Sequence, residues 1–223
     1  MSEVLWREVD RYLCESLVPS DPVLDAVLEA SERAGLPAHN VAPNQGKLLM
    51  LLAQLQRARR ILEIGTLGGY STIWLARALP NDGQLDTLEV DPGHAAVARQ
   101  NIARASLEER VQLHEGPALE TLARFAEARN EAYDLIFIDA DKPSNPDYLR
   151  WSLELTRPGS LIVVDNVIRD GEITNTSSDD PRVQGVRRMI KMISREPRLS
   201  ATAIQTVGSK GYDGFALLRV VAP

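Results

Sequence analysis

Short apolar runs alternate with amphipathic helical patterns through the middle of this chain, and this alternation constrains the fold more than any other feature. The five runs cover residues 60–64, 84–89, 111–115, 135–139 and 161–165, and the helical patterns cover residues 70–79, 93–105, 118–127 and 148–156. Strands that alternate with helices in this way form a parallel sheet with crossover helices. The sequence therefore predicts an α/β fold.

The N-terminal part of the chain is predicted to be helical. Helical patterns cover residues 4–17, 23–34 and 46–56, and Asn44 is placed to cap the third of them. We expect one domain over residues 1–223, in which residues 1–56 form a helical cap and residues 57–223 form the core.

The C-terminal part of the chain has a different pattern. After a helical pattern at residues 182–195, two apolar runs at 201–207 and 215–221 flank the glycine-rich loop 208–214. Because a connection this short joins antiparallel strands, we expect a terminal hairpin. With the five earlier runs, the hairpin makes a sheet of seven strands.

The composition is that of an ordinary globular protein, with 44% hydrophobic and 25% charged residues. A net charge of -6 gives no broad attraction for nucleic acids, so RNA is disfavoured as a partner. The single cysteine, Cys14, forms no internal disulfide, and no stretch approaches the roughly 20 apolar residues of a membrane span. We expect a cytoplasmic protein with no membrane partner.

Two of the apolar runs end in clusters of oxygen-bearing side chains. Asp139 and Asp141 follow one run, and Asp165 and Asn166 end the other. Ligands of open α/β sheets bind beyond the carboxyl ends of the strands, so Asp139, Asp165 and Asn166 are expected to converge there. Three oxygen donors with room for water suit Mg²⁺ or a similar cation. The alternative is that these residues only begin the loops after the strands, as Asp and Asn often do.

The first apolar run leads into a segment rich in small residues, which ends at Ser71. Small residues let a ligand approach the backbone, and Ser71 with the free N–H groups of a helix start can hold polar ligand atoms. The glycine spacing matches neither the dinucleotide fingerprint nor the P-loop, which argues against a dinucleotide-dependent oxidoreductase. The second run ends at Glu89, about 20 residues downstream, where an acidic side chain binds a ribose.

Four motifs, in order and each at the end of an expected strand, resemble those of the cation-dependent O-methyltransferases. This family contains catechol and caffeoyl-coenzyme A O-methyltransferases and small bacterial relatives. The motifs are ILEIGT with GYS (61–66 and 69–71), LEVDP (88–92), FIDADK (137–142) and VDNV (164–167). The resemblance extends from about residue 41 to the C-terminus. It implies the Rossmann-like class I methyltransferase fold, with strand order 3-2-1-4-5-7-6 and an antiparallel last strand.

The resemblance also implies a function: methylation of a hydroxyl on a small catechol-like or phenolic acceptor, with S-adenosylmethionine as methyl donor and a divalent metal ion. Cofactor-binding roles fall on Val41, Glu63, Gly65, Ser71, Glu89, Ala118, Asp139 and Asp141. Glu63, Gly65 and Ser71 would hold the amino acid end of the cofactor, Glu89 its ribose, and Ala118 its adenine. The implied metal ligands are Asp139, Asp165 and Asn166, with Mg²⁺ as the first choice and Mn²⁺ or Ca²⁺ as alternatives. Lys142 is implied as the catalytic base, and the N-terminal helices are implied to contribute to a homodimer.

One position departs from the family pattern. Many relatives carry Trp two residues beyond the Asn-Val pair, where this chain has Arg169. An aromatic wall over the acceptor ring is therefore not expected here. Arg169 either meets an acidic acceptor or is a solvated loop cation.

Two alternative functions remain open at this stage. Some small bacterial relatives methylate a hydroxylated base in transfer RNA, and a basic cluster would serve that function here, although a solvated helical face explains the same charges. The cluster consists of Arg182, Arg187, Arg188, Lys191 and Arg195. The other alternative is a non-catalytic S-adenosylmethionine-binding regulator, which would need neither Lys142 nor the expected metal ligands.

Overall fold

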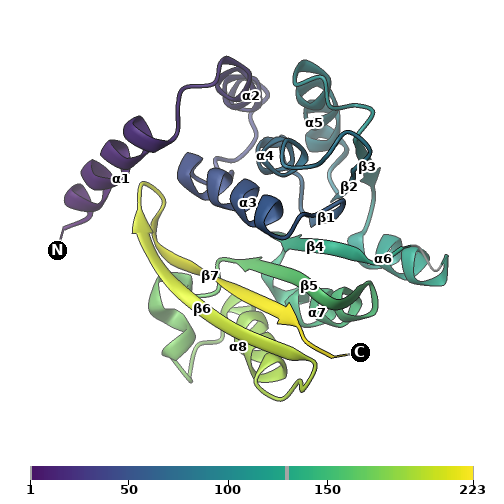
Figure 1. Cartoon of the computed structure of the whole chain (residues 1–223). Coiled ribbons are helices and arrows are strands. Elements are labelled where there is room, and N and C mark those ends of the chain that lie inside the picture. The colour runs from purple at the N-terminus through teal and green to yellow at the C-terminus, as the bar shows by residue number, and fades with distance from the viewer. Residues whose placement is uncertain (1, 129–130, 223) are drawn as a thin grey trace.

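The computed structural model describes residues 2–128 and 131–222, and within them a mixed sheet runs through the molecule (Figure 1). Its seven strands lie in the order β3-β2-β1-β4-β5-β7-β6, and β7 runs antiparallel to the two strands beside it, β5 and β6. The predicted α/β fold and strand order are thus confirmed. The strands are β1 (Arg60–Ile64), β2 (Gln84–Glu89), β3 (Val111–Glu115), β4 (Tyr133–Ile138), β5 (Thr156–Asp165), β6 (Leu199–Gly208) and β7 (Gly211–Val220).

Helices cover both faces of the sheet, as a parallel sheet with crossovers requires (Figure 1). In the figure α3, α4 and α5 lie on one face, and α6, α7 and α8 lie on the other. The helices are α1 (Glu3–Leu17), α2 (Pro22–Arg33), α3 (Pro43–Leu55), α4 (Tyr70–Ala76), α5 (Pro92–Arg104), α6 (Ala118–Glu127), α7 (Asn145–Glu154) and α8 (Pro181–Ile193). Two short 3-10 turns, η1 (Lys142–Ser144) and η2 (Arg169–Thr174), follow β4 and β5.

Alternating side chains of the central strands feed two separate cores. Ile61 and Phe137 pack on the face covered by α3 and α4, whereas Leu62 and Ile138 pack on the opposite face. All four side chains are fully buried, because these strands are covered on both faces. The strands are therefore rigid supports for the residues at their carboxyl ends.

The terminal hairpin is longer than the sequence pattern predicts. The pattern leaves residues 208–214 as a loop, but β6 continues to Gly208 and β7 begins at Gly211. Gly214 belongs to the strand because a Cβ at this position would overlap the carbonyl of Ile204 on β6. Glycine there permits the close pairing of two strands and does not mark a loop.

The N-terminal end of α3 also differs from the prediction. The helix begins at Pro43, with Ala42 as its N-cap residue, and no side chain caps it. Proline suits the first turn because its missing N–H has no helical partner there. Asn44 lies inside the helix, where its side-chain amide bonds the carboxylate of Asp10 on α1.

Helix α1 extends away from the rest of the molecule and is attached near the hairpin tip (Figure 1). The carboxylate of Asp10 accepts the backbone N–H of Ser209 at 2.8 Å. None of the helices formed by residues 2–128 and 131–222 has the length and apolarity that crossing a membrane requires.

Candidate functional site

A cavity of about 1130 Å³ opens at the carboxyl ends of β1, β2, β4 and β5. It is the place where the topology of an open α/β sheet puts ligands. All of the predicted site residues except Glu63 line it: Val41, Gly65, Ser71, Glu89, Ala118, Asp139, Asp141, Lys142, Asp165 and Asn166. Residues separated by more than 100 positions thus share one cavity.

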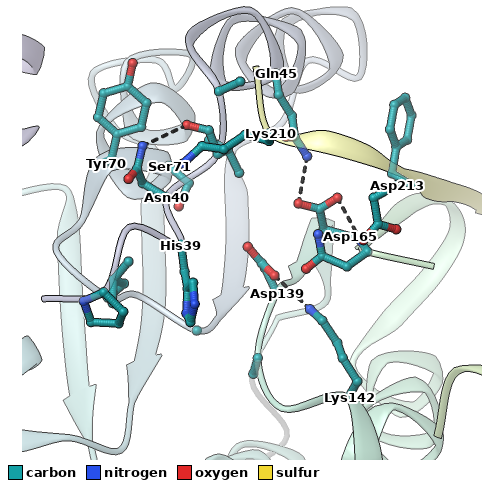
Figure 2. Close-up of a pocket in the computed structure, with 18 of the residues that line it drawn as sticks. His39, Asn40, Gln45, Tyr70, Ser71, Asp139, Lys142, Asp165, Lys210 and Asp213 are labelled. Atoms are coloured by element: carbon teal, nitrogen blue, oxygen red, sulfur yellow. Dashed lines mark hydrogen bonds and ion pairs between the residues drawn. The ribbon is translucent and has the colours of Figure 1, made fainter. Parts of the chain in front are cut away.

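The predicted metal ligands follow directly from the ends of β4 and β5. Asp139 comes one residue after β4, and Asp165 is the last residue of β5. Lys142 Nζ lies 2.8 Å from Asp139 Oδ1, and Gln45 Nε2 donates to Asp165 Oδ2 at 2.7 Å (Figure 2). Figure 2 shows these side chains together in one half of the cavity, with Tyr70 and Ser71 in the other half.

Asp165 and Asn166 form a tight turn at the end of β5. The backbone N–H of Asn166 donates to Asp165 Oδ1 at 2.8 Å. Asn166 has a φ of 57°, in the left-handed region that asparagine tolerates better than most residues. The pair is therefore placed by local backbone geometry at the edge of the sheet.

The charge balance of this half of the cavity is unfavourable without a cation. Burial, and then the negative charge of Asp139, raise the pKa of Asp165 to about 7, although Lys142 opposes the shift. Two nearby carboxylates share one lysine, so a positive ion held between them relieves the repulsion.

The donor set fits a hard divalent cation. Among the described residues no group of three or more His, Cys, Asp and Glu side chains is placed to hold a metal, but the predicted set has only two carboxylates and an amide. Three oxygen donors beside open space suit an ion that keeps several of its waters, as Mg²⁺ does. Asp139, Asp165 and Asn166 are the cavity residues that would hold such an ion.

Lys142 is held in place from behind by α8. A Cβ at Gly185 would overlap the carbonyl of Lys142, so the helix backbone packs directly on the turn that carries the lysine. The side chain of Lys142 is 9% exposed. Gly185 was not predicted as a site residue, because a glycine inside a helical pattern gives no sign of what approaches it.

Glu63 lies behind the cavity wall rather than in it. Its side chain is fully buried and accepts hydrogen bonds from the hydroxyls of Ser71, Thr72 and Thr87, the first at 2.6 Å and the last at 2.7 Å. Burial raises the pKa of Glu63 to about 7. Ser71 does line the cavity, so Glu63 reaches this space through the Ser71 hydroxyl.

Gly65 occupies a position that excludes side chains. Its φ is 103°, and a Cβ there would overlap the backbone carbonyl of Asp139. This glycine lets the end of β1 approach the end of β4 closely. It thereby joins two parts of the cavity: the predicted metal half, with Asp139, Lys142, Asp165 and Asn166, and the predicted cofactor half, with Ser71, Glu89 and Ala118.

Glu89 is fixed at the end of β2 by backbone donors. Its two carboxylate oxygens accept the N–H groups of Leu67 at 2.8 Å and Asp91 at 2.9 Å. Asp91 caps α5 by accepting from the N–H groups of Gly93 and His94, as the Asp-Pro sequence predicts. The Glu89 carboxylate therefore faces the cavity in a defined orientation.

Asp141 is oriented by a tyrosine that the sequence did not mark. The hydroxyl of Tyr148 donates to Asp141, and the N–H of Ser144 donates to it at 3.2 Å. Burial and the Asp141 carboxylate raise the pKa of Tyr148 above its ordinary value. Tyr148 lies in the first turns of α7, where its apolar ring resembled an ordinary core residue.

The basic cluster on α8 is partly engaged within the protein. Arg187 donates to the carbonyl of Ile173 at 2.6 Å, and Arg188 donates to that of Pro143 at 3.3 Å. Arg182 forms an ion pair with Asp180 at 2.7 Å. The cluster is not a continuous strip of free cations for a phosphate backbone.

The strand order, the crossover helices on both faces and the cavity at the carboxyl edge together define a class I methyltransferase fold. The O-methyltransferase family model matches residues 15–220 of the chain. The chain belongs to this family.

Individual relatives are similar to this chain over nearly its whole length. The catechol O-methyltransferase of Niastella koreensis is 51% identical over 220 residues, which cover 99% of this chain and 100% of the relative. The crystal structure of the Bacillus cereus O-methyltransferase in complex with SAH is 54% identical, with a TM-score of 0.97 over 98% of this chain and 100% of the other. That of TomG from Streptomyces achromogenes, in complex with SAM, is 46% identical, with a TM-score of 0.96 over 100% of both chains. The protein is an S-adenosylmethionine-dependent O-methyltransferase.

Proposed function

We propose that this O-methyltransferase acts on a hydroxyl of a small catechol-like acceptor and that a divalent cation assists the reaction. The observation that carries the proposal is the meeting of Asp139, Asp165 and Asn166 in one cavity, with Lys142 Nζ 2.8 Å from Asp139. The name of the 51% identical relative, a catechol O-methyltransferase, supports the same acceptor class.

The cofactor half of the cavity would hold S-adenosylmethionine, which supplies an electrophilic methyl group. Glu89 presents a fixed carboxylate for the ribose hydroxyls, and Ser71, backed by Glu63, presents a hydroxyl for the amino acid end. The remaining predicted contacts are with Val41, Gly65, Ala118, Asp139 and Asp141, all of which line the cavity. These residues orient the reacting methyl group and exclude water from it.

The metal half would orient the acceptor. Asp139, Asp165 and Asn166 would hold the cation, which would supply a positive charge that makes an acceptor hydroxyl more acidic and helps to orient it. We propose Lys142 as the base that takes the hydroxyl proton, which it can do only as the neutral amine; its position at the cavity surface beside Asp139 supports the proposal. Orientation supplies more of the rate than the proton transfer, since well-oriented reactants gain about 7 to 11 kcal/mol.

The direct test uses purified protein, S-adenosylmethionine, Mg²⁺ and caffeic acid, with and without a chelator. We expect S-adenosylhomocysteine and methylated caffeic acid to form in equal amounts, and both to disappear when the chelator is added. Product that persists in excess chelator would contradict the metal-assisted mechanism. Binding of the cofactor without methylation of any catechol would contradict the acceptor class.

We also propose a homodimer formed through α1 and β6, which contact each other at the hairpin. Large apolar side chains are exposed on both elements, and monomers rarely expose so many together. They are Val4, Leu5, Val9, Tyr12, Leu13 and Leu17 of α1 and Ile204 and Val207 of β6. A second copy of the chain is the natural cover for an apolar face of this kind.

Light scattering after size exclusion tests the dimer. We expect a dimer mass for the unaltered protein and a monomer for the double variant Tyr12→Glu/Leu17→Glu, whose side chains are exposed on α1. Glu108→Lys, an exposed charge change outside both elements, should leave the dimer intact. A monomer mass for the unaltered protein at micromolar concentration would overturn this proposal.

A cytoplasmic location completes the proposal. The chain has one cysteine, Cys14, which is free and suits a reducing compartment. Fractionation of cells that express the tagged protein, with a known cytoplasmic marker, tests the location.

A further inference from the structure

Arg169 comes shortly after the predicted metal ligands Asp165 and Asn166 in the chain. It begins η2, three residues after Asn166, and it lines the cavity together with Asp213 of β7. Figure 2 shows Asp213 on the same side of the cavity as Asp165. The guanidinium is thus carried close to the residues that would hold the acceptor hydroxyls.

The guanidinium of Arg169 has no hydrogen-bond partner among the described residues. The Nε atom is buried and unpaired, and the nearest carboxylate oxygen, Asp213 Oδ2, is 3.6 Å from Nη1. That separation is too long for a hydrogen bond. Asp213 Oδ1 is already occupied by the backbone N–H groups of Ile168 at 2.9 Å, Arg169 at 3.0 Å and Gly214 at 3.0 Å.

Other cations at the cavity are satisfied within the protein. Lys142 pairs with Asp139 at 2.8 Å, and Lys210 donates to the carbonyl of Ala38 at 3.0 Å. Arg182 makes a two-pronged contact with Asp180 at 3.1 and 2.7 Å. Arg169, whose ion pair with Asp213 spans 3.6 Å, is therefore the one lysine or arginine lining the cavity whose side chain makes no hydrogen bond among the described residues.

The backbone that carries Arg169 is held in one conformation. Arg169, Asp170 and Gly171 have φ values of 54°, 56° and 86°, all in the left-handed region. The carboxylate of Asp213 bonds the N–H groups on this turn, so the conformation is fixed before any ligand arrives. The planar guanidinium on this fixed backbone can bind a carboxylate through two parallel hydrogen bonds.

We propose that Arg169 binds the carboxylate of an aromatic acid whose adjacent hydroxyls lie at the metal half, so that the preferred acceptors are catecholic acids. This inference rests on the proposed function and narrows its acceptor class. Asp170 and Asp213 also line this part of the cavity, and their negative charges favour a monoanion over a phosphate dianion.

The test compares acids with neutral partners of the same shape. One pair is 3,4-dihydroxybenzoate and 3,4-dihydroxybenzamide, and the other is caffeate and caffeamide. The carboxylate lies further from the ring in caffeate than in 3,4-dihydroxybenzoate, so the two pairs test two distances. For the unaltered enzyme we expect kcat/KM to favour the acid by at least about tenfold in one pair. Arg169→Gln should lower kcat/KM for that acid by at least about tenfold, mainly through KM, and leave its amide within about twofold.

Two further variants test whether the preference for the acid depends on the geometry of the guanidinium and on this position. Arg169→Lys keeps the charge but not the two-pronged geometry, so it should retain only part of the preference for the acid. Arg182→Gln is the matched control, because that guanidinium already pairs with Asp180 and its side chain is 60% exposed. It should leave the ratio of acid to amide unchanged.

The outcomes distinguish this subsite from the proposed function. If the unaltered enzyme methylates acids and amides equally in both pairs, the subsite is wrong and the catechol methyltransferase stands. The same conclusion follows if Arg169→Gln impairs the acid and the amide equally. If none of the four catechols is methylated although the cofactor binds, the proposed acceptor class fails and this inference fails with it. The preference of the unaltered enzyme keeps the test decisive even if Arg169→Gln does not fold.

Discussion

The two halves of the cavity treat their acidic side chains in opposite ways. In the cofactor half, Glu63 is surrounded by three hydroxyl donors and Glu89 by two backbone N–H groups. In the metal half, Asp139 and Asp165 lie close enough to repel each other, and their side-chain partners are one lysine and one glutamine. The acids of the first half are surrounded by hydrogen-bond donors of the protein, whereas in the second half two neighbouring carboxylates have one lysine between them, which leaves one negative charge to spare.

The two halves suit two different kinds of ligand. A neutral sugar or an amino acid group needs fixed donors and acceptors that do not reorganise, and the cofactor half has them. A divalent cation needs negative charge that the protein itself leaves uncompensated, and the metal half has it. Substitutions in the two halves should therefore have different signatures.

The largest effect is expected from Asp139→Ala in the metal half. The change removes a proposed metal ligand and the partner of Lys142, so kcat/KM should fall by about 10³-fold or more. Lys142→Ala removes only the proposed base and should cost about 10²- to 10⁴-fold. We expect Asp139→Ala to be at least as damaging, measured as product formation at saturating metal.

Asp147→Ala is the control for this comparison, because Asp147 is an exposed acid on α7 that pairs only with Arg150. It should retain full activity. A Lys142→Ala enzyme much weaker than the Asp139→Ala enzyme under saturating metal would reverse the assigned order of importance.

The second prediction concerns the pH dependence of stability through Glu63 in the cofactor half. Burial raises the pKa of this carboxyl from its ordinary value of 4.5 to about 7 in the folded protein. The folded state therefore holds a proton that the unfolded state has lost between these pH values, and stability falls as pH rises through the interval. The interval corresponds to about 3 kcal/mol of unfolding free energy.

Glu63→Gln removes this titration and isolates it from all other groups. We expect the cofactor-free variant to gain about 3 kcal/mol relative to the unaltered protein as pH rises from 4.5 to 7.5, measured by urea unfolding. A constant difference between the two proteins across this range would mean that Glu63 titrates normally.

The third prediction is that a substitution at Asp165 raises the stability of the metal-free protein and removes the response to Mg²⁺. Asp165→Asn removes the buried one of two repelling charges. It keeps an oxygen for the bond from Gln45 but loses the acceptor of the Asn166 N–H, so at pH 8, where Asp165 is ionised, the metal-free protein should show a net gain of about 2 kcal/mol. We expect Mg²⁺ to stabilise the unaltered protein against thermal unfolding and the variant to lose this effect. Thermal unfolding with and without Mg²⁺ measures both effects, and Asp147→Asn should change neither. A destabilised metal-free variant would contradict the account of excess charge in this half.

The sequence predicts those features of the two halves that depend on residues close together in the chain, such as strands and the residues at their ends. The apolar runs identify the strands, and the carboxyl end of each strand identifies Glu89, Asp139 and Asp165, because strand ends of a parallel sheet meet at one edge. The strand order and the residue roles followed from the resemblance, since spacing alone does not specify which strands are neighbours.

The partners of those residues were not predictable. Gln45 bonds Asp165 from 120 positions away, and Tyr148 orients Asp141 from the first turns of α7. Both belong to patterns that are typical of ordinary helices, and a contact between distant elements leaves no periodic signal. The extent of the hairpin was missed for a related reason, because Gly214 suggested a loop where close pairing with β6 requires glycine.

The smallest effect is expected from Glu89→Gln in the cofactor half. Glutamine keeps one carbonyl acceptor, so it can satisfy only one of the N–H groups of Leu67 and Asp91 and loses the charge that faces the ribose. The affinity for S-adenosylmethionine should fall by about tenfold, which corresponds to about 1.4 kcal/mol. Calorimetric titration of the cofactor measures this, and the KM for a catechol at saturating cofactor should not change. If the catechol KM rose as much as the cofactor Kd, the two halves would not be independent, and the fixed acids of one could not be separated from the spare charge of the other.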